Sequence, residues 1–473
     1  MPRTTRLATL LHAGLIGAAL CAAPANLIAE TPSGEFCAEV PARACVLAEA
    51  IAGLDEIDDE WDLSYAREAV VRGHAESGFF DAALAFVAGF DDAQARDAAY
   101  WPIIRAQVAA GLITEATATA ARIEDAANRS YGQRVLSAAL SDAGHLDAAL
   151  AVVRAIPEPR DRDWALGDIA AAQVRAGLLP EALATAREIP FEWTRAVALA
   201  RIAAAGGDPQ LVAEAAQLAR RLSHDALRAR VLGNVAELAD PALFAEAQTL
   251  AREIADARSR ASVFSSLVSG MAKTGQVELS QATVADMDEG DQRDHALNHI
   301  AVAQARTGTN IEAMGTAAAI GSPDVLGLAL NGIARAHVEG GRIALALEAA
   351  RAIDATETGW RATTLAQIAE ATGAPDLFAE ALEATRTIED LGWRSRALLT
   401  VAGTQENPAI LDEAVEVART ADDPEESGWA LAMIAEALAM SGRAEAALAT
   451  ARSIEMPGLR VSALTAIVPH LPE

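Results

Sequence analysis

The strongest constraint on the fold of this chain is a sequence repeat of 33 residues. Segments 177–189 (GLLPEALATAREI) and 442–454 (GRAEAALATARSI) share the run ALATAR and end on the same residue type. The position of that final isoleucine, called the anchor below, recurs along the chain, and ten of its twelve intervals are 33 residues long. The anchors are Ile57, Phe90, Ile123, Ile156, Ile189, Leu222, Ile254, Met287, Ile320, Ile353, Ile388, Ala421 and Ile454. A fixed period of this length indicates stacked structural repeats.

A second column of residues supports the same register. Thirteen residues after each anchor, or fifteen after Ile353, every unit has a branched aliphatic residue. These residues are Val70, Ile103, Leu136, Ile169, Ile202, Val235, Leu267, Ile300, Ile333, Ile368, Val401, Ile434 and Ile467. In segment 162–175, Leu166, Ile169 and Ala170 lie on one stripe of a helix. Each unit is therefore predicted to begin with an amphipathic helix, called helix A.

Helix A is predicted to end at a turn that takes two forms. Eight units have a glycine there, which can adopt the left-handed conformation that ends a helix: Gly78, Gly111, Gly144, Gly177, Gly275, Gly308, Gly341 and Gly442. Four units have a proline instead, which stops helix A and fits the first turn of the next helix: Pro209, Pro241, Pro375 and Pro408. The second helix, helix B, then runs to the next anchor, as in residues 181–189.

These signals predict an all-α protein, an α-solenoid of about twelve 33-residue helix-turn-helix repeats over residues 42–473. An opening helix near 42–54 and a closing helix near 459–471 are left without a partner of their own and are expected to cap the ends. Hydrophobic residues make up 52% of the chain and aromatic residues 4%, so the core must consist of Ala, Leu, Ile and Val. Such residues favour closely packed helices.

The repeat unit resembles the tetratricopeptide repeat. The matching residues in the unit at 156–189 are Ile169 and Ala170 in helix A, Gly177 at the turn, and Ala182 and Leu183 in helix B. The period is 33 where that family has 34, and the large aromatic residues of the family are mostly Ala or Leu here. The resemblance implies a concave groove, lined by the A helices, that holds peptide segments of other proteins.

The N-terminus has the features of an export signal. Arg3 and Arg6 precede an uncharged stretch from Leu7 to Ala23, and small residues offer cleavage after Ala25 or Ala29. We expect residues 1–29 to be a signal peptide and 30–41 a short N-terminal segment, so that the protein is periplasmic or secreted. An uncleaved membrane anchor is the alternative. No later stretch has the length and apolar character of a membrane span.

Charge and cysteine content narrow the classes of partner. The net charge is −28, which disfavours nucleic acid and anionic lipid as partners. Cys37 and Cys45 both precede the first long helix, and in an exported protein such a pair predicts a disulfide. The alternative is two unlinked thiols.

The chain has no recognisable catalytic or cofactor motif, and we expect no enzyme activity, cofactor or metal. His295 and His299 share a helix face and could bind a metal, but no third ligand has a diagnostic spacing. The acidic stretches 55–62 and 286–294 lack the pattern of a calcium loop and fall between units, where solvated acids are expected. Lys273 is the single lysine of the chain and lies in a plain turn.

The resemblance to tetratricopeptide repeats also assigns candidate binding residues to the groove side of helix A. These residues are Glu68, Arg72, Trp101, Arg105, Tyr131, Arg134, Asn298 and Asn331. Aromatic and arginine side chains are enriched at binding hot spots. The alternative is that Trp101 and Tyr131 pack between helices while the arginines neutralise neighbouring acids.

The leading functional interpretation is an exported, non-enzymatic scaffold that binds a peptide or protein partner in a superhelical groove. A second hypothesis is a structural element of the cell envelope that self-associates through its ends. A third is an enzyme built from helical hairpins closed into a barrel, which the aliphatic character of the strict column disfavours.

Overall fold

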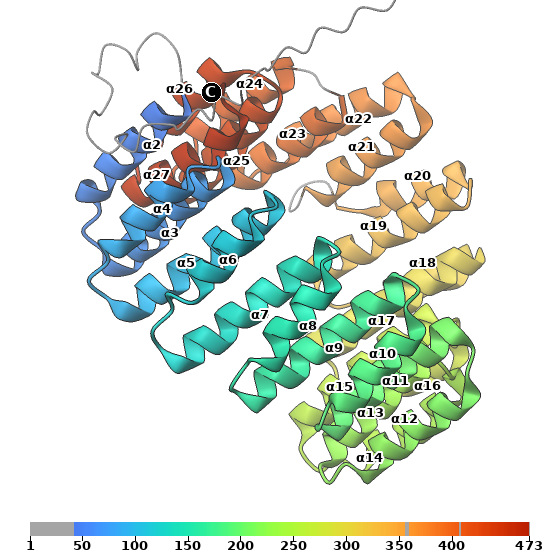
Figure 1. The fold of residues 1–473 in the computed structure, drawn as a ribbon. Coiled ribbons are helices and arrows are strands. Elements are labelled where there is room, and N and C mark those ends of the chain that lie inside the picture. Colours follow the sequence, from blue (N-terminus) through green and yellow to red (C-terminus); the bar gives the residue numbers. More distant parts are fainter. Residues whose placement is uncertain (1–41, 355–358, 406–407, 473) are drawn as a thin grey trace, which may run out of the picture.

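The structure is a computed structural model that describes residues 42–354, 359–405 and 408–472. All regular structure in these segments is helical, with no strand, and the fold class predicted from the repeat is confirmed: an all-α array of helix-turn-helix repeats (Figure 1). None of the helices in these segments has the length and apolar character needed to cross a bilayer. The predicted signal peptide at 1–29 and the segment 30–41 lie outside the described residues.

Two sets of helices alternate along the chain. The A helices are α3 (Glu60–Glu76), α5 (Ala93–Ala109), α7 (Ala126–Asp142), α9 (Pro159–Arg175), α11 (Glu192–Gly206), α13 (Asp225–Leu238), α15 (Ala257–Lys273), α17 (Asp291–Thr307), α19 (Pro323–Glu339), α21 (Trp360–Thr372), α23 (Leu391–Gln405), α25 (Pro424–Met440) and α27 (Pro457–Ile467). Short 3-10 turns lie at η1 (Gly53–Glu56), η2 (Pro241–Leu243) and η3 (Val468–His470). The B helices are α2 (Arg43–Ala52), α4 (Phe80–Ala88), α6 (Ile113–Ala120), α8 (Leu146–Arg154), α10 (Leu179–Glu188), α12 (Pro209–Arg221), α14 (Phe244–Arg252), α16 (Val277–Val284), α18 (Asn310–Ala317), α20 (Ile343–Ala352), α22 (Pro375–Arg386), α24 (Pro408–Arg419) and α26 (Ala444–Arg452).

The two predicted forms of the turn are both present. All eight turn glycines have a positive φ, between 69° and 89°, as the left-handed end of a helix requires. In the proline form, α12, η2, α22 and α24 begin at the predicted prolines. Every residue of the strict aliphatic column is buried, and none of them is more than 3% exposed. The register predicted from the sequence is therefore the register of the fold.

The array closes on itself. Helix α27, the last helix A, packs against α3, the first helix A, and against α2. In Figure 1 the blue helices α2 and α3 lie beside the red helices α25 and α27. The side chain of Arg43 donates from Nε to the carbonyl of Leu471 at 2.8 Å and from Nη2 to that of Pro469 at 3.2 Å. Helix α2 thus serves as the helix B of α27, and the thirteen hairpins of the described segments form a ring.

The closure, called the seam below, uses the same contacts as the interior of the array. In several units the arginine two residues before an anchor pairs with an acid of the next helix B, as Arg220 does with Glu246 at 2.7 Å. At the seam Arg452 pairs in the same way with Glu49, at 2.8 and 2.6 Å. Glu49 and Glu246 both stand eight residues before their anchors. Such exposed pairs contribute little stability. Their value here is that they show how neighbouring hairpins are aligned, at the seam as in the interior.

The expectation that the first and last helices cap two open ends is corrected by the seam. Leu47 of α2 and Val461 of α27 are each at most 2% exposed, because each helix buries the apolar face that a cap would leave to solvent. A Cβ added at Gly53 would lie 3.0 Å from Val461, which shows how closely the two ends approach.

The A helices lie on the inner side of the ring and the B helices on the outer side. Each helix A packs against the helix A of the next unit, whereas successive B helices in the described segments have no comparable contact. Neighbouring helices are closest on the smaller circumference, so the layer of A helices faces inward.

Two kinds of polar contact join neighbouring hairpins in part of the array. In eight units an arginine six residues after the anchor donates to the anchor carbonyl, at 2.7–3.2 Å, and so satisfies the end of helix B: Arg96, Arg129, Arg162, Arg195, Arg228, Arg260, Arg394 and Arg460. In three units a buried aspartate seven residues after the anchor accepts from backbone amides that lead into the next helix A: Asp97, Asp163 and Asp294.

Candidate functional site

The inward face of each helix A is the side that does not pack into the apolar core. In α9, Ile169 is 1% exposed and faces helix B, whereas Trp164 is 48% exposed. Residues four, eight, eleven or twelve, and fifteen positions after an anchor fall on this inward stripe, which follows from the helical period. The candidate site must therefore be built from these positions on neighbouring A helices.

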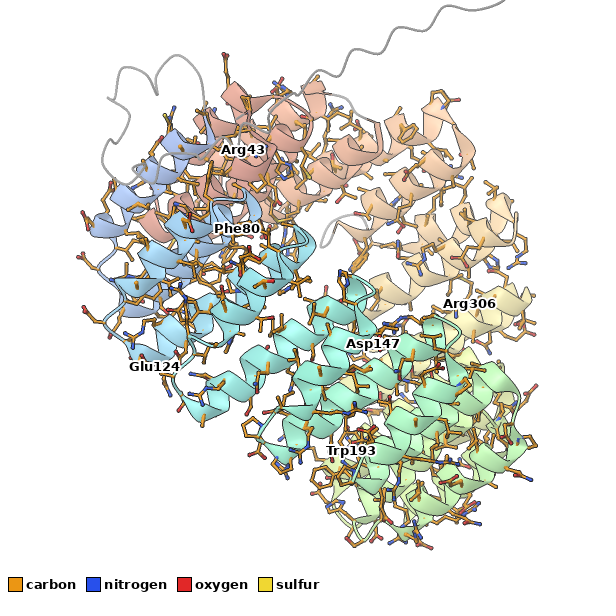
Figure 2. All side chains as sticks on the ribbon, viewed as in Figure 1. Arg43, Phe80, Glu124, Asp147, Trp193 and Arg306 are labelled. Carbon is orange, nitrogen blue, oxygen red and sulfur yellow. The ribbon has the colours of Figure 1, made fainter. Side chains whose placement is uncertain are left out.

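Aromatic and arginine side chains form a continuous band on this face over α5, α7, α9 and α11. The band, called the aromatic band below, consists of Trp101, Tyr131, Arg134, Trp164 and Trp193. The rings of Trp101 and Tyr131 are 4.3 Å apart at their centroids. The guanidinium of Arg134 lies 5.0 Å from the Tyr131 ring and 5.3 Å from the Trp164 ring. Trp164 then meets Trp193, labelled in Figure 2, edge to face at 6.2 Å.

The band is held in place by its surroundings. Arg134 Nη1 donates to Asp161 Oδ1 at 3.1 Å, which fixes the guanidinium between the two rings. Gly132 leaves room for the Ile123 side chain beside the band, because a Cβ there would lie 2.3 Å from Cδ1 of Ile123, whereas it would be in ordinary contact with Trp101 at 3.7 Å. The indole N–H of Trp101 is buried without a hydrogen-bond partner in the described residues. Tyr131 and Trp164 stay 38% and 48% exposed, so the band offers free ring surface.

The inward face also affects the ionisation of one acid, Asp168. The pKa of the Asp168 carboxyl on α9 is raised, mainly because desolvation penalises its charged form. Arg201, Arg134 and Arg175 oppose this effect but do not cancel it. Asp168 is exposed, and two of these arginines, Arg134 and Arg201, lie on the A helices on either side of α9.

The structure brings together three of the residues predicted from the sequence: Trp101, Tyr131 and Arg134. Glu68 and Arg72 form an exposed ion pair of 3.0 Å with each other on α3, outside the band. Arg105 is exposed on α5, four residues after Trp101. The packing alternative weighed for Trp101 and Tyr131 is also realised in part, since Trp101 is half-buried against α7.

The two asparagines predicted from a shared column have different surroundings. Asn331 is 7% exposed, and its amide donates to Thr364 Oγ1 at 2.8 Å and to Gln367 Oε1 at 3.2 Å. It joins α19 to α21 and keeps no donor free for a ligand. Asn298 is half-buried, and its Oδ1 has no partner among the described residues.

Trp164 and Trp193 belong to the band but were not among the residues predicted from the sequence. Trp164 lies eight residues after its anchor, as do Tyr65, Tyr131 and Trp429, so this column held the missing signal. Tyr65 and Trp429 meet at 6.5 Å although they lie on α3 and α25. The helix between them, α27, has Ser462 in this column. Their contact therefore depends on the seam.

The described residues hold no group of three or more side chains arranged to ligate a metal. The pKa of His299 is lowered, first by burial and then by Lys273 and His295. Cys45 is buried in α2 and is disulfide-bonded. Cys37 lies outside the described residues, so the pairing of Cys37 with Cys45 stays a prediction.

No protein-family model matches the sequence, and no curated protein is detectably similar to it. Among solved structures, Ton1535 from Thermococcus onnurineus NA1 is 14% identical over 77% of this chain and 97% of its own, with a TM-score of 0.25. The APC/C hetero-tetramer Cut9–Hcn1 is 11% identical over 85% and 88%, with a TM-score of 0.27. A circular tandem repeat protein is 13% identical over 91% and 98%, with a TM-score of 0.14. At these values the three structures support no statement about how this chain acts.

Proposed function

We propose that this protein is a binding scaffold that holds a segment of a protein partner against the inner face of its ring. The observation that carries the proposal is the aromatic band: five side chains from four successive A helices in unbroken contact. Aromatic and arginine residues supply much of the energy of protein interfaces. The exposed surface of these aromatic side chains is not needed to stabilise the array of hairpins, since the aliphatic core does that.

The contacts within the band suit a peptide segment. Arg134 between two rings offers stacking and cation–π contact to a partner side chain. The rings of Tyr131 and Trp164 are rigid, so little conformational entropy is lost when they bind. Tryptophan and tyrosine also tolerate polar neighbours, which fits the charged surroundings of a concave face.

The proposal includes a compartment and a mode of action. The predicted signal peptide would place the ring outside the cytoplasm, where a disulfide at Cys45 is chemically stable. We regard the protein as a non-enzymatic scaffold because the band is built from aromatic rings and a guanidinium, which are groups that bind a partner. Self-association through the ends of the array is less favoured, because α2 and α27 bury those ends against each other.

Selection of peptides from a displayed library on the immobilised full chain would test the proposal. Selected peptides should bind the variant Tyr131→Ala/Trp164→Ala about tenfold or more weakly than the parent protein, as expected for loss of two hot-spot side chains. Phe79→Ala is the matched control, since Phe79 is 37% exposed at the turn between α3 and α4, outside the band. Equal affinity of the parent protein and the double variant for every selected peptide would refute the proposal.

A further inference from the structure

The next arc of the inner face, beyond the aromatic band, carries a pocket of ≈ 340 Å³. It lies between α13 and the start of α15, with Gln292 of α17 at its far side. The polar side chains that line it are His224, Arg230, Arg258, Ser259, Ser262 and Gln292. Arg258 stands four residues after its anchor, in the column that Trp193 occupies in α11. The pocket therefore continues the inward stripe of the band.

The pocket is positively charged in a strongly acidic chain. No carboxylate lines it, although the chain as a whole has a net charge of −28. Among the described residues no ion pair or hydrogen bond is found for the guanidinium of Arg230 or of Arg258. Most arginines of the outer helices have such a partner, as Arg252 has in Asp286 at 2.8 Å.

The acids closest in sequence are already engaged. Asp225 pairs with Arg228 at 3.0 Å. Asp256 caps α15 by accepting from the amide of Ser259 at 2.7 Å. The pKa of Asp256 is lowered first by the Ser259 hydroxyl, then by this amide, and less by the nearby charges of Arg258 and Arg260. Neither carboxylate lines the pocket, so the two guanidiniums remain available to a ligand.

We infer that this pocket binds an oxyanion, the carboxylate or phosphate group of a ligand held on the inner face. Two guanidinium forks can donate in pairs to the oxygens of such a group, and these charge-assisted bonds are shorter and stronger than neutral ones. The hydroxyl of Ser262 and the amide of Gln292 add neutral donors at the rim. A concave site with one sign of charge also attracts a ligand of the opposite sign from solution. Where the proposed function holds, the anion belongs to the same partner segment that contacts the aromatic band.

Isothermal titration of the full chain with inorganic phosphate and, separately, with succinate tests the inference, at an ionic strength kept constant with chloride. Each anion that binds should saturate at one site, and the variant Arg230→Gln/Arg258→Gln should bind it about tenfold or more weakly. The stronger of the two anions identifies the chemical group. The control is Arg187→Gln, an exposed arginine of the outer helix α10 outside the pocket, which should bind like the parent protein.

Absence of saturable binding for both anions would overturn the inference, as would equal binding by the double variant and the parent protein. The double variant should fold, because both arginines are exposed and lie outside the core. Circular dichroism checks that it does. The variant Tyr131→Ala/Trp164→Ala separates this inference from the proposed function. It should bind the anions like the parent protein, even if no peptide is found that binds the band.

Discussion

Removal of the Leu47 side chain tests whether α2 is an interior element of a closed ring. Leu47 is 2% exposed and packs where α2 meets α3 and α27: a Cβ added at Gly73 would lie 3.2 Å from its Cδ2 and 3.2 Å from Cβ of Thr465. Leu47→Ala deletes three buried carbon atoms and leaves a cavity between three helices. Such changes cost about 2–5 kcal/mol when the site is fully packed. We therefore expect the free energy of unfolding to fall by about 2–4 kcal/mol.

Urea unfolding followed by circular dichroism measures this loss, and hydrogen exchange locates it. The matched control is Leu411→Ala, because Leu411 is 7% exposed and also stands ten residues before its anchor, in an interior helix B. Both variants should lose comparable stability, with faster exchange in α27 and α3 for Leu47→Ala and in α23 and α25 for Leu411→Ala. A loss below about 0.5 kcal/mol for Leu47→Ala, beside a full loss for Leu411→Ala, would mean that α2 is a frayed end and that the seam is wrong.

The remaining predictions concern buried polar groups. Asp97→Ala removes the acceptor of the amides of Glu124 and Asp125, at 3.2 and 2.9 Å, and should lower the free energy of unfolding by about 1–3 kcal/mol. The control Asp91→Ala, at an exposed aspartate, should change the free energy of unfolding little. Equal effects of the two substitutions would contradict the role assigned to Asp97. His337 is buried and accepts at Nδ1 from Arg342, and burial, then Arg342, lowers its pKa. Because its folded pKa lies below its ordinary value of 6.5, its stabilisation is present above pH 6.5 and is lost as the pH falls through the folded pKa. The melting temperature should fall on acidification below pH 6.5, and less in His337→Gln; parallel curves for both proteins would count against this. Asn331→Ala should cost about 1–2 kcal/mol of stability, because its two hydrogen bonds join α19 to α21, without weakening the binding of selected peptides.

The sequence predicts the units of this fold well because each unit follows local rules. A glycine at the turn allows a positive φ, which Gly177 adopts at 76°, and the strict column identifies the buried side of helix A, as at Ile169. These features depend on helical periodicity and on backbone conformation, which a short segment determines by itself.

Closure of the ring could not be derived in the same way. It depends on the small rotation between successive hairpins, summed around the whole array, and no single residue determines that sum. One signal was available. The predicted array opens with a helix B that has no helix A before it, in which Glu49 occupies the acid column. It closes with a helix A that follows Arg452, and arginines of that column pair with such acids elsewhere. These two half-repeats complement each other.

The candidate site was predicted in part for a similar reason. Trp101, Tyr131 and Arg134 were found because they fall on the groove side of helix A. Trp164 lies in the same column as Tyr131 and was missed, because contact between side chains of different helices depends on the approach of those helices. Asn331 was predicted as a binding residue from its column, but its amide already donates to the hydroxyl of Thr364 on the neighbouring helix.

A cross-link across the seam tests the closed ring most directly. A Cβ added at Gly458 in α27 would lie 3.5 Å from Cβ of Asp62 in α3, within the range of about 3.5–4.5 Å found in disulfides. We predict that Asp62→Cys/Gly458→Cys oxidises within one chain to a monomer that migrates faster in a non-reducing denaturing gel, whereas neither single variant does. Free thiols at both positions after oxidation, or cross-linked dimers without the fast monomer, would contradict the closed ring.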